Sequence, residues 1–357
     1  MCYHESPELI SRYLKLSLNT DFSDHQTMKS ADNVENLILS LKPSSHIFAG
    51  IGQTFRNLKI LALFGGHTLK FIRRSDFNDL PDLEELSLFN TEFDFIPEDT
   101  FWNLLNLKTL KIINTKLIKL PRHLLFGLGK LEEFKFHFHS FVQIPFGFLD
   151  HSKNIKKLHL ERCELFVDGE TTWDLPNLEE IYLAWSNLVE IPAKFLANSN
   201  KLKTLNLVHS RLANLGKEFQ KSVSNLEDLK LSGNPIELSF DSFSELRNLR
   251  NLSLATCNIR ILPQSVFEPL IRLETLDLSH NQLAFLQWNV FADNLQLREI
   301  NLKFNSLTRI DVDFLHIPKL RFLDLTQNFC IDEVYNSLYS TTLLMMKQII
   351  DRECSIY

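Results

Sequence analysis

Residues 273–291 read LETLDLSHNQLAFLQWNVF, and the spacing of their leucines decides the fold. Leucine stands at positions 273, 276, 278 and 283, and Asn281 lies between the last two. Neither the period of a strand nor the period of a helix fits this stretch for long. A mixed pattern of this kind is typical of a repeated unit that combines a short strand with a turn.

The same pattern recurs along the chain. Further copies begin at Val34, Leu58, Leu83, Leu107, Leu131, Ile155, Leu178, Leu202, Leu226, Leu249, Leu297 and Leu320. Successive copies start 23, 24 or 25 residues apart. They match L-x-x-L-x-L-x-x-N/C-x-L, whose period is about 20 to 29 residues, so the chain resembles the leucine-rich repeat proteins.

Each repeat predicts one coil of a solenoid. The two leucines of the x-L-x-L-x segment point inward from a short strand, and the residues around them point outward. One coil cannot bury its inward face alone, whereas stacked coils form a continuous parallel sheet. We therefore expect an α/β fold, a leucine-rich repeat horseshoe of about fourteen coils with a parallel concave sheet. The solenoid would span residues 1–329, without a recognisable N-terminal cap, and residues 330–357 would form a C-terminal cap.

The asparagine position predicts how each coil is closed. A buried amide there can donate to and accept from the backbone of neighbouring coils. Asparagine occupies the position at Asn234, Asn281, Asn305 and Asn328. Earlier coils carry Thr91, Thr115, His139, Cys163, Ser186, Ser210 and, once among the asparagines, Cys257. Because a hydroxyl or thiol has fewer donors, we expect a less regular set of hydrogen bonds in the middle of the chain.

A recurrent phenylalanine marks the second half of most repeats. It occurs at Phe77, Phe101, Phe195, Phe219, Phe243, Phe267, Phe291 and Phe314. We expect these rings to stack as a spine beneath the convex side. Such a spine accounts for much of the count of 29 phenylalanines without an aromatic binding site.

Cys330 and Cys354 bracket the segment that ends the chain. The stretch LYSTTLLMMKQIID between them has the apolar spacing of a helix. A helix laid over the last coil and tied back by a disulfide would cover an exposed apolar end. Such a bond would indicate an oxidising compartment, whereas the alternative is two unpaired thiols in a cytosolic protein. We favour the disulfide.

The repeats and the tail together resemble extracellular proteins of the typical leucine-rich repeat class, which includes Toll-like receptor ectodomains. The repeats carry LPxxxF-like second halves, as in LIKLP, and Cys330 follows the LDLTQN of the last repeat. This tail is similar to the one-disulfide caps of secreted insect leucine-rich repeat proteins, some of which act in innate immunity. The resemblance implies a secreted, disulfide-bonded protein.

Outward strand positions predict where a partner binds. In the C-terminal coils the central outward residue is small and polar, whereas the middle coils carry aromatic and basic residues. The predicted partner-binding residues are Phe89, Lys111, Lys135, His137, Phe138, His159, Arg162, Tyr182, Trp185 and His209. Exposed aromatics and arginine are typical of interface hot spots, so we expect a protein partner on this face. The alternative is that Phe138 and Trp185 fold back along the sheet edge and pack against the loops.

The sequence predicts neither an enzyme nor a cofactor site, because it lacks the G-x-S-x-G, P-loop and Rossmann patterns. His137, His139 and His159 could together ligate zinc. His139, however, holds a coil-closing position and is expected to turn away from His137. We therefore predict no metal site.

Charge and hydropathy exclude two further classes of protein. The net charge is −6 with both signs interspersed, which does not match the basic footprint of a nucleic-acid binder. Apolar stretches such as TTLLMM are too short to span a bilayer. The first residues do not form a recognisable signal peptide. The sequon Asn251-Leu252-Ser253 predicts a glycan on an outward strand position, although a chance match explains it equally well.

Two hypotheses of function follow. The first is a secreted, non-enzymatic protein-binding protein of innate immunity or cell-surface recognition. The alternative is an intracellular leucine-rich repeat scaffold or a fragment of a receptor ectodomain. The identity of the ligand and the oligomeric state are not predicted.

Overall fold

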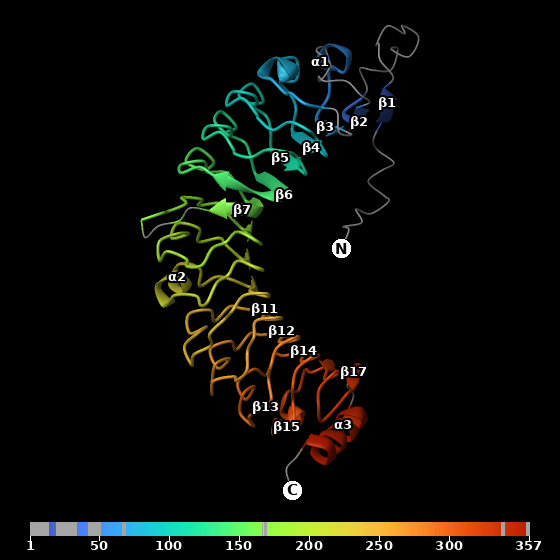
Figure 1. The fold of residues 1–357 in the computed structure, drawn as a ribbon, viewed down its shortest axis with the longest axis vertical. Helices are drawn as coiled ribbons and strands as arrows, with labels where there is room; N and C mark the ends of the chain where they lie inside the picture. Colours follow the sequence, from blue (N-terminus) through green and yellow to red (C-terminus); the bar gives the residue numbers. More distant parts are fainter. Residues whose placement is uncertain are drawn as a thin grey trace. The chain divides into compact units, whose positions relative to one another are not determined.

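The computed structural model describes residues 14–18, 34–41, 51–65, 69–165, 167, 170–336 and 340–354. The chain forms two compact units. Unit 1 is Met1–Phe166 and unit 2 is Val167–Tyr357. Each unit is a stack of coils in which a strand, a turn and an irregular return segment alternate (Figure 1).

The strands of unit 1 pair in parallel and in chain order. They are β1 (Leu14–Leu18), β2 (Asn36–Leu41), β3 (Ile60–Phe64), β4 (Glu85–Phe89), β5 (Thr109–Ile113), β6 (Glu133–Ile144) and β7 (Lys157–Leu165). The return segments include the short helices α1 (Ile51–Thr54) and η3 (Arg74–Phe77). Equivalent repeat positions lie opposite each other, as Leu86 does with Leu110.

Unit 2 repeats this arrangement with shorter strands. Its parallel strands are β8 (Glu180–Tyr182), β9 (Thr204–Asn206), β10 (Asp228–Lys230), β11 (Asn251–Ser253), β12 (Thr275–Asp277), β14 (Glu299–Asn301) and β16 (Phe322–Asp324). Strand β17 (Val334–Asn336) pairs antiparallel with β16, and β13 (Phe285–Leu286) pairs with β15 (Arg309–Ile310) in a separate ladder. The return segments include α2 (Lys217–Ser222) and η4 (Phe314–His316).

The inward leucines form the core. Leu229, Leu252 and Leu276 lie opposite one another in successive strands and are 0%, 1% and 0% exposed. This confirms the inward positions read from the repeat. The parallel-sheet solenoid predicted from the sequence is likewise confirmed.

The closing asparagines of unit 2 make the expected hydrogen bonds. The Asn281 amide donates to the carbonyls of Leu254 and Leu278 at 2.8 and 2.9 Å. Its oxygen accepts from the backbone N–H groups of Cys257 and Ile259 at 2.9 and 3.0 Å. The same four bonds recur at Asn234. Asn305 and Asn328 keep both donated bonds, and each accepts from one backbone N–H group, that of Leu283 and that of Leu307.

Where another residue closes the coil, fewer bonds form. Ser186 Oγ donates to the carbonyl of Leu183 at 2.5 Å, and Ser210 Oγ donates to the same carbonyl at 3.1 Å. The buried hydroxyl of Thr91 has no hydrogen-bond partner. The less regular bonding expected for these coils is therefore confirmed.

The aromatic spine is also confirmed. Its phenylalanines are buried, and neighbouring rings stack: the centroids of Phe243 and Phe267 lie 6.2 Å apart, and those of Phe267 and Phe291 lie 6.0 Å apart. In unit 1 the rings of Phe77 and Phe101 lie 5.6 Å apart. These residues are part of the core and not of a binding site.

A C-terminal helix packs against the return segment that follows β14. Helix α3 (Ser340–Cys354) buries Met346 and Ile350 and packs near η4 and β15 (Figure 1). Cys330 and Cys354 form a disulfide with their Cα atoms 5.2 Å apart, as expected. Leu344, which shares the apolar pattern, is exposed instead. The division of the chain into residues 1–329 and 330–357 stays a prediction.

Candidate protein-binding surface

The outward side of the unit 1 sheet carries an apolar row. The parallel register places Phe64 opposite Phe89 and Phe89 opposite Ile113. The rings of Phe64 and Phe89 stack with centroids 4.8 Å apart, and Phe64 is 36% exposed. Phe89 was predicted from the sequence and Phe64 was missed. The signal was present, because both residues follow the second inward leucine of their repeats.

A basic column runs beside this row. Lys111, Lys135 and His159 occupy the central outward position of β5, β6 and β7 and lie opposite one another. Lys111 Nζ lies 3.1 Å from Glu85 Oε1. Among the described residues, Lys135 has no carboxylate within ion-pairing distance. The column can therefore offer an ammonium group to an acidic partner.

His137 and Glu161 form a hydrogen-bonded pair that continues the apolar row, because His137 lies opposite Ile113 and Glu161 lies opposite His137. His137 Nδ1 lies 2.8 Å from Glu161 Oε2. The hydrogen bond from His137 lowers the pKa of Glu161, against the opposing effect of burial, and the charge of His137 acts in the same direction. Arg162 follows Glu161 and takes a left-handed backbone conformation with φ of 58°.

Strand β6 departs from the repeat pattern. Its backbone stays extended through Ile144, and the register with β7 shifts between His137 and Val142. The side chains of Phe138 and His139 lie outside the described part of the structure. Within the described part, no group of three or more histidine, cysteine, aspartate or glutamate residues could hold a metal ion.

Unit 2 places two of the predicted residues in one aromatic stack. The rings of Trp185 and His209 lie 4.0 Å apart at an interplanar angle of 25°. The Trp185 ring thus packs on His209 of the next coil, yet Trp185 remains 41% exposed. Tyr182 is the last residue of β8, and its hydroxyl donates to Glu180 Oε2 at 3.0 Å.

The backbone at Trp185 and His209 is unusual for such large side chains. The residue before the closing position is left-handed in coil after coil, with φ of 62° at Trp185, 54° at His209 and 73° at Gly233. Glycine adopts this conformation freely, whereas a bulky residue there is uncommon and strained. Trp185 and His209 therefore adopt a backbone conformation that is uncommon for large side chains, as Arg162, His280 and Phe304 do at the same repeat position.

A second stack at the same repeat position was missed from the sequence. The rings of His280 and Phe304 lie 4.5 Å apart, Phe304 is 42% exposed, and Lys303 Nζ lies 5.1 Å above the Phe304 ring. Both residues also have positive φ. Their equivalence to Trp185 and His209 in the repeat was the signal that could have revealed them.

Other candidate groups behave as structural residues. Burial raises the pKa of the Cys257 thiol to about 11 and also raises that of Cys163, so neither presents a thiolate at neutral pH. Asn251 is exposed at the start of β11, where the predicted glycan would stand. Within the described residues, no helix has the length and apolar character needed to cross a membrane.

Comparison with sequence families identifies repeats of a single kind. A model described as leucine rich repeat matches residues 200–259 and 271–328. A second, described as a BspA type leucine rich repeat region, matches residues 51–156 and 94–219. No curated protein sequence matches the chain.

Several solved structures share the fold. A chain of the Drosophila Toll–Spatzle complex is 21% identical, with a TM-score of 0.72 over 85% of this chain and 40% of that one. A chain of the TLR13–ssRNA13 complex is 20% identical, with a TM-score of 0.58 over 82% of this chain and 50% of that one. The leucine-rich repeat domain of APL1B is 18% identical, with a TM-score of 0.64 over 92% of this chain and 88% of that one. The chain thus spans half or less of the Toll-complex and TLR13-complex chains.

Proposed function

Because this chain is a leucine-rich repeat protein, we propose that it is a non-enzymatic protein that binds another protein through the outward face of its sheet. Solenoids of this kind offer long, regular surfaces for recognition. The proposed surface comprises the row and column of unit 1 and, separately, Tyr182, Trp185 and His209 of unit 2.

The Trp185–His209 stack is the observation that carries the proposal. A tryptophan held half-exposed in a strained backbone conformation lowers the stability of the free protein. Tryptophan is also among the residues most enriched in interface hot spots. A partner that buries the exposed part of the Trp185 ring would gain the contact area that hot-spot residues provide.

We further propose that the protein is secreted and acts in immunity. The Cys330–Cys354 disulfide supports an oxidising compartment. The fold shared with a chain of the Toll–Spatzle complex, which is described as a hub in Drosophila development and innate immunity, supports a similar setting. The buried cysteines, which offer no thiolate nucleophile, support a non-enzymatic role.

The test is the binding of a partner isolated by cross-linking from the native secretions and then purified. We expect Tyr182→Ala with Trp185→Ala to weaken binding at least about tenfold, as for hot-spot residues. Trp288→Ala is the matched control, because Trp288 is exposed but lies outside the strands. Equal affinity of both variants and the wild type, with intact folds, would place the binding surface elsewhere.

A further inference from the structure

One row of side chains alternates in charge from coil to coil. The row consists of the residue that follows the first leucine of each repeat, just before the strand. In unit 1 it reads Glu35, Lys59, Glu84, Lys108, Glu132 and Lys156, and in unit 2 it reads Glu179, Lys203, Glu227, Arg250, Glu274 and Arg298. We call this row the charge ladder.

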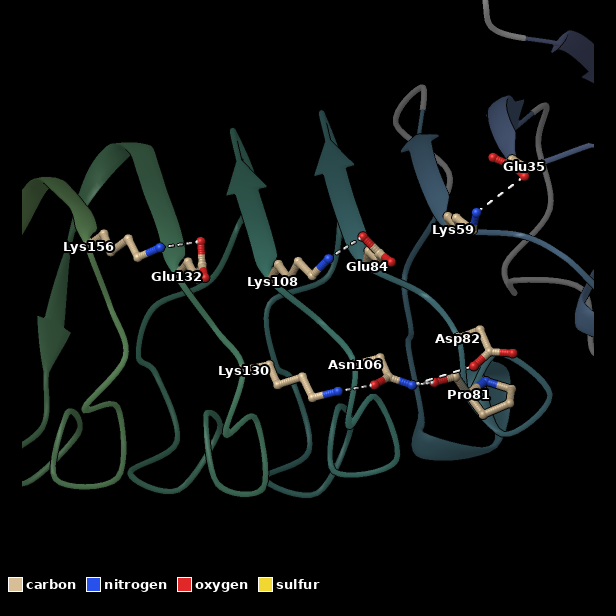
Figure 2. Close-up of polar contacts among 10 residues, drawn as sticks. All are labelled: Glu35, Lys59, Pro81, Asp82, Glu84, Asn106, Lys108, Lys130, Glu132 and Lys156. Carbon is tan, nitrogen blue, oxygen red and sulfur yellow. Dashed lines mark hydrogen bonds and ion pairs between the residues drawn. The ribbon is translucent and has the colours of Figure 1, made fainter. Parts of the chain in front are cut away.

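In unit 1 the ladder forms three ion pairs between neighbouring coils (Figure 2). Lys59 Nζ lies 3.2 Å from Glu35 Oε1, and Lys108 Nζ lies 2.6 Å from Glu84 Oε2. Lys156 Nζ lies 3.0 Å from Glu132 Oε2. The residues that precede the first leucine of each repeat form a second row. In this row Lys130 donates to Asn106, and Asn106 donates to the Pro81 carbonyl (Figure 2).

In unit 2 the ladder is continuous from Lys203 to Arg298. Lys203 Nζ lies 3.1 Å from Glu227 Oε1, and Glu227 Oε2 lies 3.6 Å from Arg250 Nε. Arg250 Nη1 lies 2.6 Å from Glu274 Oε1, and Glu274 Oε2 lies 3.4 Å from Arg298 Nε. Glu227, Arg250 and Glu274 therefore each contact opposite charges in both adjacent coils.

The apolar core cannot by itself fix the order of the coils. Leu229, Leu252 and Leu276 are the same residue in the same buried position, so a coil would pack almost equally well on its next-but-one neighbour. A chain that leaves one coil out as a loop loses the burial of that coil's own leucines, but closing the loop adds only a modest entropy cost, so such a state can form while the chain is partly folded. Misassembly of neighbouring units is a characteristic failure of repeat proteins.

The alternation of charge distinguishes the native order of the coils from a stack in which one coil is left out. Omission of the coil that contains β11 would set Glu227 beside Glu274, and omission of the β10 coil would set Lys203 beside Arg250. In unit 1, omission of the β5 coil would set Glu84 beside Glu132. We propose that the charge ladder fixes the order in which the coils stack, by opposing every arrangement that omits a coil whose two neighbours both belong to the ladder.

The last coil marks the limit of this effect. Arg321 occupies the ladder position there and repeats the positive sign of Arg298. Omission of the β14 coil would therefore set Glu274 beside Arg321, which is an attractive pair. The ladder leaves this one error unopposed, so misfolded wild-type chains should loop out the β14 coil more often than any other coil of unit 2.

The test compares variants of the full-length chain with its disulfide intact, refolded from denaturant by dilution. E227R/R250E keeps composition and net charge but breaks the alternation. The matched control E179K/K203E/E227K/R250E/E274K/R298E inverts six signs and keeps both the alternation and the net charge. Native yield is measured after refolding, and looped-out coils are located by limited proteolysis and mass spectrometry.

We expect E227R/R250E to lower the native yield at least about threefold and to create new cleavage sites in the β10 or β11 coil, while the inverted variant refolds at least as well as the wild type. Salt near 1 M, where the screening length is about 3 Å, should lower the wild-type yield towards that of E227R/R250E. If E227R/R250E does not fold at all, the neutral variant E227Q/R250Q should give an intermediate yield with the same cleavage sites. Equal yields for the wild type and E227R/R250E, or equal loss in E227R/R250E and the inverted variant, would overturn the proposal.

Discussion

The imidazole ring of His209 occupies the space that a Cβ atom on Gly233 would need. Its other face stacks on Trp185. Because Gly233 has no side chain, the His209 ring can lie over it and stack on Trp185 of the coil before. Gly233 also has φ of 73°, which glycine adopts without strain.

Gly233→Ala should therefore destabilise the protein by about 1 to 3 kcal/mol, because it adds backbone strain and displaces His209. The free energy of unfolding in urea measures this effect. Gly216→Ala is the matched control, since Gly216 has negative φ and nothing within 4 Å of the added Cβ. Equal stability of the two variants would show that His209 can move away at no cost.

Asn281→Ala should cost at least about 3 kcal/mol, because it leaves several buried backbone groups without partners. Ser186→Ala should cost about 1 kcal/mol, because Ser186 donates a single hydrogen bond from the equivalent position. Urea unfolding of both variants tests the ranking. A larger loss of unfolding free energy for Ser186→Ala than for Asn281→Ala would contradict the roles of the two closing residues.

Removal of the disulfide by Cys330→Ser with Cys354→Ser should cost about 3 kcal/mol, as expected for a cross-link that closes a loop of 24 residues. Cys257→Ser provides the comparison, since Cys257 is buried but unpaired. Mass spectrometry of non-reduced protein from its native source should find Cys330 joined to Cys354. Free thiols at both positions would instead favour an intracellular scaffold.

The Glu161–His137 pair predicts a dependence of stability on pH. The pKa of Glu161 is lowered in the folded protein, so the ionised carboxylate stabilises the fold. This contribution is complete above the ordinary pKa of 4.5 and is lost as the pH falls through the lowered value. The difference in unfolding free energy between the wild type and Glu161→Gln should shrink below about pH 4.5. A difference that stays constant from pH 7 to pH 3 would exclude this coupling.

The sequence predicts those features that every coil must satisfy in the same way. Each coil has to bury its leucines, satisfy its closing turn and pack a phenylalanine on the next, so Leu252, Asn281 and Phe267 recur at fixed intervals. The predicted disulfide follows the same logic, since the last coil would otherwise expose its apolar end.

Features that depend on the backbone of one coil or on its neighbours were not predictable. The extension of β6 to Ile144 breaks the period locally. The stacking of Trp185 on His209 depends on which side chains stand at this position in two successive coils. Phe64 lies in a weak copy of the repeat, and its stacking on Phe89 depends on the register between strands.

The alternation of the charge ladder has a consequence for how such a chain can change in length during evolution. A duplication of one coil, or the deletion of a coil that has ladder coils of opposite sign on both sides, would place two glutamates or two basic residues side by side at the junction. Moving two coils together, such as LEELSL with LKTLKI or LEEIYL with LKTLNL, leaves every neighbour opposite in sign. The smallest interchangeable part of this protein is therefore a pair of coils, one acidic and one basic at the ladder position, and new family members should differ from it by even numbers of repeats.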